Sequence, residues 1–260
     1  VESQMQKLKF KKKIQLINYE KLNKTNLNNK FINLINLDYK QNKPFKKISK
    51  KSKKYINESF NIAFKIINSG YTDKFINGPV SKKNFLKNKY LGITEFISKK
   101  YDIKLSAMLI FNKNLSVCPI TTHLPLKLVS KKITKKFIKE KITIINGFYN
   151  KILGFKPIIG VVGLNPHCES ILKFNEDTKI ILPTINSLKR RGIKISGPYP
   201  SDTIFMKNNI KKFDVIVGMY HDQVLAPIKT LFEYDAINIT IGLPFLRITP
   251  DPGPNEIMVG

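Results

Sequence analysis

Short apolar runs alternate with amphipathic segments through the second half of the chain, and this alternation narrows its possible folds more than any other feature. The runs KPIIGVVGLN, IKISGPYP, FDVIVGMY and AINITIGL have the length and β-branched content of buried strands. Between them, EDTKIILPTINSLKRRG and SDTIFMKN have helical patterns; we expect Pro183 to interrupt the first, Gly192 to end it, and Ser201 to cap the second. This order predicts an α/β fold with a largely parallel sheet.

The first half of the chain has a weaker pattern. Residues 1–54 form a poorly defined start rich in Lys and Asn, in which KIQLINY and FINLINL could be edge strands. YINESFNIAFKIINSG predicts a helix that ends at Gly70, and DKFINGPV predicts a short strand. LSAMLIF and LSVCPITT predict two adjacent strands. Residues 126–149 predict one helix or two, because Lys139–Lys141 blur the apolar pattern.

The formal net charge of +28 raises nucleic acid as a partner. However, the lysines are spread over the whole chain, without zinc-finger spacing or an RNA-binding signature, so we expect non-specific binding at low salt and no specific nucleic-acid site. No apolar run reaches the roughly 18 residues of a membrane helix, and no signal-peptide pattern follows the basic start. We therefore expect a cytoplasmic protein without a membrane partner.

The two cysteines and the lack of known nucleotide-binding motifs argue against a cysteine-based metal site and against the common nucleotide-binding folds. Cys118 and Cys168 lack metal-site spacing and are expected to be buried or idle thiols, although Cys168 beside His167 leaves a metal role open. Neither the Rossmann fingerprint G-x-G-x-x-G nor a P-loop is present, since GVVGLNP has the wrong spacing.

The chain has three histidines, and each follows an apolar, strand-like run: His123 in ITTHLPL, His167 in GLNPHCES and His221 in MYHDQ. In parallel α/β sheets, ligands bind at the carboxyl ends of the strands, so the three side chains could converge. Neutral imidazole binds divalent metals, and three protein ligands leave a position open for substrate. The alternative is three unrelated histidines that cap strands or bond the backbone.

Arg247 is the one arginine outside the helix end that contains Arg190 and Arg191. A guanidinium can bind a phosphate or carboxylate through two parallel hydrogen bonds, which Lys cannot do. Arg247 is therefore a candidate anchor for an anionic substrate group. Asp202 and Asp222 lie near the expected strand ends and could orient metal ligands, with helix capping as the alternative for Asp202.

Seven motifs occur in order from about Ile56 to the C-terminus: NGPVSK, GITEF, TTHLPL, GLNPH, GPYPSDT, GMYHDQ and NITIGLPFLR. Together they resemble the 4-hydroxythreonine-4-phosphate dehydrogenase family of vitamin B6 synthesis. The resemblance implies one enzyme chain over residues 1–260. It also implies a two-lobed α/β/α fold like that of the isocitrate and isopropylmalate dehydrogenases, with the active site in the cleft between lobes whose boundary the sequence does not mark.

The resemblance also implies a reaction and its participants. An NAD- and metal-dependent enzyme would oxidise 4-phosphooxy-L-threonine, and loss of CO2 would give 3-amino-2-oxopropyl phosphate for pyridoxal 5'-phosphate synthesis. The family binds one divalent ion per site (zinc, magnesium or cobalt) at a homodimer interface, and NAD without a Rossmann fingerprint. The implied site residues are His123, His167 and His221 for the metal, Thr94, Lys229, Asn238 and Arg247 for the substrate, and Lys229 and Asp202 for catalysis.

This chain departs from the family pattern in three places. Ile93 stands where the family usually has a histidine that contacts the substrate, which leaves open a sibling dehydrogenase of a threonate or erythronate 4-phosphate. Pro252 stands in a loop that lies at the adenine end of NAD in the related dehydrogenases. The family's N-terminal glycine-rich loop and C-terminal segment have no counterpart, so we expect a fragment. A non-catalytic basic relative that binds metal or nucleic acid is the alternative from another class.

Overall fold

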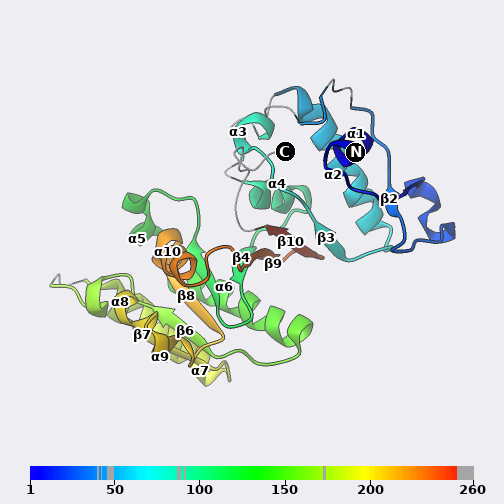
Figure 1. Ribbon diagram of the computed structural model, residues 1–260. Helices are drawn as coiled ribbons and strands as arrows, with labels where there is room; N and C mark the ends of the chain where they lie inside the picture. Colours follow the sequence, from blue (N-terminus) through cyan, green and yellow to red (C-terminus); the bar gives the residue numbers. More distant parts are fainter. Residues whose placement is uncertain are drawn as a thin grey trace. The chain divides into compact units, whose positions relative to one another are not determined.

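The computed structural model describes residues 1–39, 41, 43–45, 50–86, 89–90, 92–171 and 174–250 (Figure 1). The chain folds into two compact units, the first built on Val1–Ile93 and the second on Thr94–Asp251. The loop Asp251–Gly253, expected near the adenine of NAD, lies outside the described residues.

The first unit contains the short elements that the weak N-terminal pattern predicted. The pieces KIQLINY and FINLINL form two parallel strands, with Ile14 opposite Ile32. The long helix ends at Asn68, and Gly70 follows with a φ of 76°, so the predicted glycine stop is confirmed. The elements in chain order are α1 (Glu2–Lys7), β1 (Ile14–Leu16), β2 (Ile32–Leu34), α2 (Lys53–Asn68), β3 (Lys74–Ile76) and α3 (Lys82–Phe85).

The second unit carries the strand–helix alternation. Its elements are α4 (Ile93–Lys100, which starts at the last residue of the first unit), β4 (Ala107–Phe111), β5 (Ser116–Thr121), α5 (Val129–Lys132), α6 (Lys135–Phe148), β6 (Ile159–Val162), α7 (Leu182–Arg190), β7 (Ile195–Tyr199), α8 (Ser201–Ile204), α9 (Lys207–Ile210), β8 (Val215–Tyr220), α10 (His221–Phe232), β9 (Ile237–Ile241) and β10 (Leu246–Pro250).

The strands of the second unit lie in the order β10-β9-β4-β5-β8-β6-β7. Strands β5, β8, β6 and β7 are parallel neighbours, whereas β4 pairs antiparallel with both β5 and β9, and β10 pairs antiparallel with β9. The predicted α/β fold is therefore confirmed, with β4 and β10 running against the other strands.

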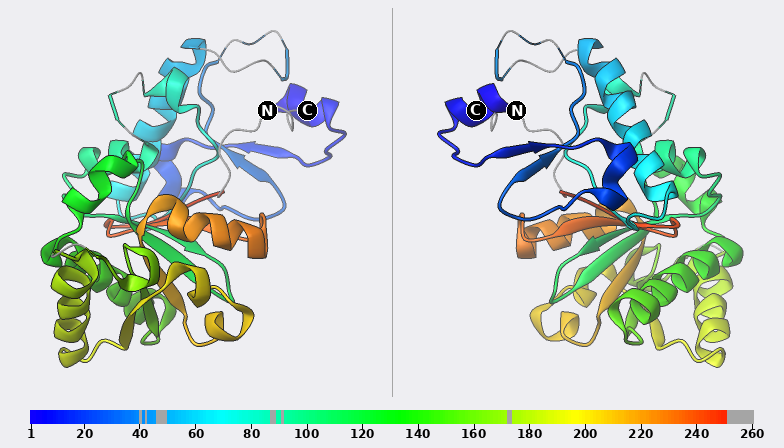
Figure 2. Two further views of the ribbon diagram at one scale, coloured as in Figure 1. Left: turned by 90° about the vertical axis from the view of Figure 1, so that its left-hand side faces the viewer. Right: turned by 90° about the vertical axis from the view of Figure 1, so that its right-hand side faces the viewer.

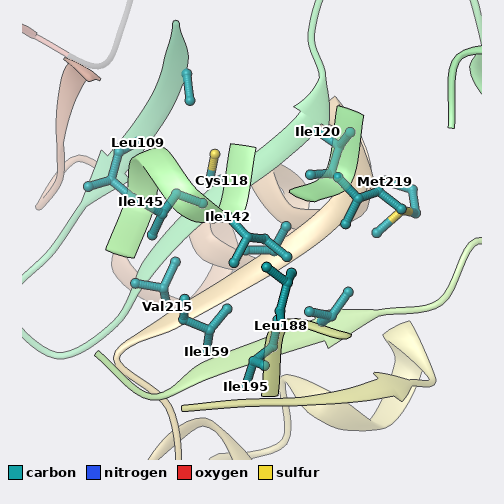
Figure 3. Close-up of a cluster of buried hydrophobic side chains, with 14 of the residues drawn as sticks. Leu109, Cys118, Ile120, Ile142, Ile145, Ile159, Leu188, Ile195, Val215 and Met219 are labelled. Carbon is teal, nitrogen blue, oxygen red and sulfur yellow. The ribbon is translucent and has the colours of Figure 1, made fainter. Parts of the chain in front are cut away.

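Side chains alternate between two hydrophobic layers on the faces of this sheet. On β8, Val215, Val217 and Met219 belong to one layer with Ile142 of α6 and Leu188 of α7. Figure 3 shows Val215, Met219, Ile142 and Leu188 in this layer. The intervening Ile216 belongs to the other layer, with Val224 and Ile228 of α10, the helix drawn in orange in Figure 2. Because both faces are covered, the central strands are apolar throughout, which is why they were visible in the sequence.

Most of the expected elements are present, and several details differ. Residues 126–149 contain two α-helices. Pro183 lies in the first turn of α7, which directly follows a π-helical turn, Asp177–Ile181, so the predicted helix changes from π- to α-helical geometry next to this proline. Ser201 is the first residue of α8 and makes no capping hydrogen bond, so the predicted cap was wrong. Both cysteines are free thiols, as expected, and Cys118 is fully buried. No helix in the described ranges has the length and hydropathy to cross a membrane.

Gly218 of β8 gives a direct test of how tightly α10 packs on the sheet. A Cβ atom there would lie 2.4 Å from Val224 Cγ1, so Gly218→Ala should lower the free energy of unfolding by about 1–3 kcal/mol. Gly147 of α6 is the matched control: no described atom lies within 4 Å of its Cβ position, so Gly147→Ala should stabilise by about 0.5–1 kcal/mol. Urea unfolding measures both, and a neutral Gly218→Ala would contradict the close packing.

Candidate functional site at the strand ends

The carboxyl ends of β5, β8 and β6 lie side by side, because β8 pairs in parallel with both of the other strands. His123 follows β5 by two residues, and His221 directly follows the last residue of β8. His167 lies in a 3-10 turn, Pro166–Cys168, beyond β6. The strand-end placement of the three histidines is therefore confirmed, on three neighbouring strands.

Two polar side chains tie these strand ends together. The Thr121 hydroxyl at the end of β5 donates to the carbonyl oxygen of Met219 in β8, at 2.8 Å. The Gln223 side chain, which is buried, accepts from the Met219 N–H at 2.7 Å and donates to the carbonyl oxygen of Gly163 at 2.7 Å. Gln223 thus joins the end of β8 to the residue that follows β6. Buried backbone groups require such partners, so these bonds fix the strand ends relative to one another.

A buried carboxylate organises the loop that carries His167. Asp177, with 0% of its surface exposed, accepts hydrogen bonds from the N–H groups of Leu164 (2.7 Å) and Asn165 (3.1 Å) and from the Asn165 side-chain amide (2.8 Å). A Cβ atom on Gly163 would lie 2.7 Å from Asp177 Oδ1, so the glycine permits this close approach. His167 and Cys168 follow with φ values of 55° and 61°, a left-handed turn that is rare outside glycine.

His123 and His221 face one another, with ring centroids 5.9 Å apart. His221 Nδ1 lies 2.6 Å from Asp222 Oδ1, and His123 Nδ1 lies 3.9 Å from Glu95 Oε1. An ionised carboxylate only accepts hydrogen bonds, so Asp222 favours the tautomer of His221 with its proton on Nδ1 and its lone pair on Nε2. This carboxylate–imidazole arrangement is typical of histidines that bind metals.

Among the described residues, the third histidine does not complete a metal site with the other two. Across the described residues, no group of three or more His, Cys, Asp or Glu side chains has an arrangement that could hold a metal ion. The structure therefore brings together His123 and His221, while the three-histidine site remains a prediction. Cys168 has its pKa raised to about 11, first by burial and then by Asp177, with smaller effects of Asp202 and Glu169.

A cavity of about 360 Å³ adjoins His123. Its wall contains Thr94 and Glu95 from α4, Ser106 and the start of β4, and Lys141 from α6. Two of the chain's predicted site residues, Thr94 and His123, therefore line one cavity. Its volume is in the range of small-molecule sites.

Arg247 lies in β10, and 3% of its surface is exposed. Its Nη1 donates to the hydroxyl oxygens of Thr94 at 3.1 Å and of Thr240 at 2.6 Å. Burial lowers the pKa of the guanidinium to about 10, and Glu95 opposes the shift. The structure thus joins Arg247 to Thr94, two residues for which the resemblance implied substrate contacts. On the neighbouring strand β9, Asn238 Oδ1 is buried and has no hydrogen-bond donor among the described residues.

Neither Lys229 nor Asp202 is among the described residues that line the cavity beside His123. Lys229 points toward the end of its own helix, where Nζ lies 3.5 Å from the carbonyl oxygen of Glu233 and 5.8 Å from the Tyr234 ring centroid. Desolvation lowers the pKa of Lys229. Asp202 is exposed at the start of α8, beyond the carboxyl end of β7. The catalytic roles of both residues remain predictions.

Sequence reasoning missed four residues that shape this site. Gln223 stands within the HDQ motif and Glu95 within GITEF, so their positions beside predicted site residues were a usable signal. Lys141 left a trace as the polar residue that blurred a helical pattern. Asp177 had no local signal, because its partners lie 12 and 13 residues away.

The Gln223 bridge can be tested with a substitution of similar volume. Gln223→Leu leaves the Met219 N–H and the Gly163 carbonyl without their partner, which should lower the free energy of unfolding by about 2–5 kcal/mol. Gln6→Leu, at an exposed position of α1, should change it by less than about 0.5 kcal/mol. Equal stability of the two variants in urea unfolding would show that the bridge is dispensable.

Comparisons with known proteins agree with this architecture. The family model of the pyridoxal phosphate biosynthetic protein PdxA matches residues 1–255. A 4-hydroxythreonine-4-phosphate dehydrogenase of Sulfurihydrogenibium sp. is 39% identical over 233 residues, which cover 88% of this chain and 70% of the relative. A D-threonate 4-phosphate dehydrogenase of Pectobacterium atrosepticum is 34% identical over 165 residues, 63% of this chain and 51% of the relative.

Solved structures give the same result. The crystal structure of a 4-hydroxythreonine-4-phosphate dehydrogenase from Burkholderia phymatum superposes with a TM-score of 0.78 and 28% identity, over 97% of this chain and 77% of that one. The agreement of the family model, the sequence relatives and the fold shows that this chain belongs to the PdxA family, the 4-hydroxythreonine-4-phosphate dehydrogenases of vitamin B6 biosynthesis.

Proposed function

We propose that this chain acts as an NAD- and divalent-metal-dependent dehydrogenase that oxidises 4-phosphooxy-L-threonine and releases CO2 to give 3-amino-2-oxopropyl phosphate. The observation that carries the proposal is the pair His123 and His221 at the strand ends, each with a carboxylate beside Nδ1. Family membership supports the substrate class, and the cofactors are those that the sequence resemblance implies.

The donor set fits a divalent metal. Two partly exposed imidazoles face one another, and His167 follows the third strand of the same edge. Imidazole donors suit zinc or cobalt better than magnesium, which prefers oxygen ligands. A bound ion of this kind would polarise the substrate hydroxyl and stabilise negative charge on the adjoining oxygen.

Arg247 would bind an anionic group of the substrate with a side chain that is already restricted by hydrogen bonds. Its two threonine partners restrict the guanidinium, so little side-chain entropy would be lost on binding. The buried Asn238 Oδ1 would accept a hydrogen bond from a substrate donor such as an ammonium or hydroxyl group. Together these residues would orient the substrate beside the histidine pair.

Proton transfer would fall to Lys229 and Asp202. A lysine whose pKa is lowered gives up its proton more readily near neutral pH, which suits a general acid. Asp202 could accept a proton from solvent-exposed groups at the same edge of the sheet. NAD, when bound, would accept the hydride from the substrate carbon; its expected contact loop lies outside the described residues.

A homodimer would complete the metal site. Within the described part of one chain, the candidate ligands form a pair and not a group of three. A second subunit would contribute the third imidazole ligand.

A sibling activity on a threonate or erythronate 4-phosphate is the second candidate. The Pectobacterium relative is named a D-threonate 4-phosphate dehydrogenase, so a protein 34% identical to this chain has a name with a different substrate. Ile93 is buried at the start of α4, directly before Thr94, so this position offers no polar group to the substrate.

Kinetics of Arg247→Lys test the substrate anchor. The change keeps a positive charge but removes the planar fork, so kcat/KM for 4-phosphooxy-L-threonine should fall about ten- to a hundredfold, while the KM for NAD should change little. Arg190→Lys, at the end of α7, is the matched control and should keep wild-type kinetics. NADH absorbance measures kcat/KM and the KM for NAD, and its comparison across the candidate phosphorylated substrates shows which one the enzyme prefers. Wild-type efficiency in Arg247→Lys would refute the anchor, and absence of NADH formation with every substrate would refute the dehydrogenase.

A further inference from the structure

A buried lysine lies in the wall of the cavity beside His123, and the proposed reaction leaves it without a role. Lys141 is 7% exposed and lies in the middle of α6. It stands on the buried stripe of the helix with Ile138, Ile142 and Ile145, which are 0% exposed. Burial of an ammonium costs several kcal/mol unless hydrogen bonds and opposite charges compensate, so a lysine at this position requires a partner.

The described residues compensate this ammonium only in part. Lys141 Nζ donates a hydrogen bond to the carbonyl oxygen of Ser106 and lies 5.3 Å from the centroid of the Phe137 ring. Burial lowers the pKa of Lys141, and the charges of Cys118 and Glu95 oppose this shift. An ammonium has three donors, and the described part of the chain supplies this one acceptor. The remaining donors belong to a group in the cavity wall, which places them where a ligand could accept from them.

The charges around the cavity do not balance. Three lysines, Lys99, Lys104 and Lys141, line it together with a single carboxylate, that of Glu95. Glu95 also interacts electrostatically with Arg247 and lies 3.9 Å from His123 Nδ1. One glutamate thus faces several cations. Without counting His123, the lining has a formal excess of two positive charges, three minus one; Lys99 and Lys104 are exposed, and Lys141 is the buried member. An excess of this size matches a phosphate monoester, which has nearly two negative charges at neutral pH.

We propose that this cavity is a phosphate-binding subsite, with the Lys141 ammonium as its buried counter-ion. The hydroxyl groups of Thr94, Ser98 and Thr122 line the same cavity and would supply neutral donors to the remaining phosphate oxygens. Lysine binds phosphate as a point charge, without the planar geometry that an arginine requires. The choice of the substrate's phosphate as occupant rests on the proposed dehydrogenase function; the anion site itself rests on Lys141 and the cavity.

Binding of inorganic phosphate to the purified protein tests the subsite independently of turnover. Isothermal titration at about 0.15 M salt, where exposed lysines are screened, would compare the wild type with Lys141→Met and Lys135→Met. Lys135 is exposed at the start of the same helix and matches the charge change. We expect Lys135→Met to bind like the wild type and Lys141→Met to bind about ten- to a hundredfold more weakly.

Two results would overturn the proposal: equal phosphate affinity in Lys141→Met and the wild type, or no phosphate binding by the wild type at millimolar concentration. Lys141→Met should fold, because Met has a similar volume and the change leaves one carbonyl, that of Ser106, without its donor, at a cost of about 1–3 kcal/mol. If it does not fold, Lys141→Gln, which keeps donors but loses the charge, is measured under the same conditions with the same expectation. Lys141-dependent phosphate binding without NADH formation would contradict the dehydrogenase while supporting the subsite.

Discussion

The buried amide of Gln223 is the contact on which the geometry of the candidate site depends. It holds the Met219 N–H of β8 and the Gly163 carbonyl after β6, while Thr121 secures β5 to the same Met219. The ends of these three neighbouring strands are therefore held in place, and so are the starting points of the segments that carry the histidines. Without these bonds, buried polar groups of the backbone would lose their partners and the strand ends would separate from one another.

The buried charged residues of the second unit differ in how many hydrogen bonds compensate their charge. Asp177 is fully compensated by the loop that it organises, since three donors surround its carboxylate. Arg247 has two threonine hydroxyls, whereas Lys141 has one carbonyl in the described chain. Apolar residues of the same volume would usually serve a core equally well, so the incomplete compensation of Lys141 among the described residues supports the proposed ligand beside it.

The sequence predicted the elements that local pattern determines. Strands β5, β6 and β8 were visible because both faces of the sheet are covered and the runs are apolar throughout. Helix α10 was missed because Pro227 lies inside it, and β10 because its five residues include Arg247 and end at Pro250, which weakens the strand pattern. His123, His221 and Arg247 stood out as rare residue types in a lysine-rich chain. Gln223 and Lys141 are common residue types that left only weak signals, a place in the HDQ motif and a break in a helical pattern, whereas Asp177 had none because its partners lie 12 and 13 residues away.

The central claim of the proposal is that His123, His167 and His221 together hold one divalent ion, with a second subunit supplying the imidazole that one chain does not bring to the pair. Elemental analysis of the purified protein and of His123→Ala, His167→Ala and His221→Ala tests it most directly. The account predicts about one ion per chain in the wild type and in Cys168→Ser, which removes only the neighbouring thiol, and loss of most metal in each histidine variant. Equal metal content in the wild type and any one of the histidine variants would contradict the three-imidazole site.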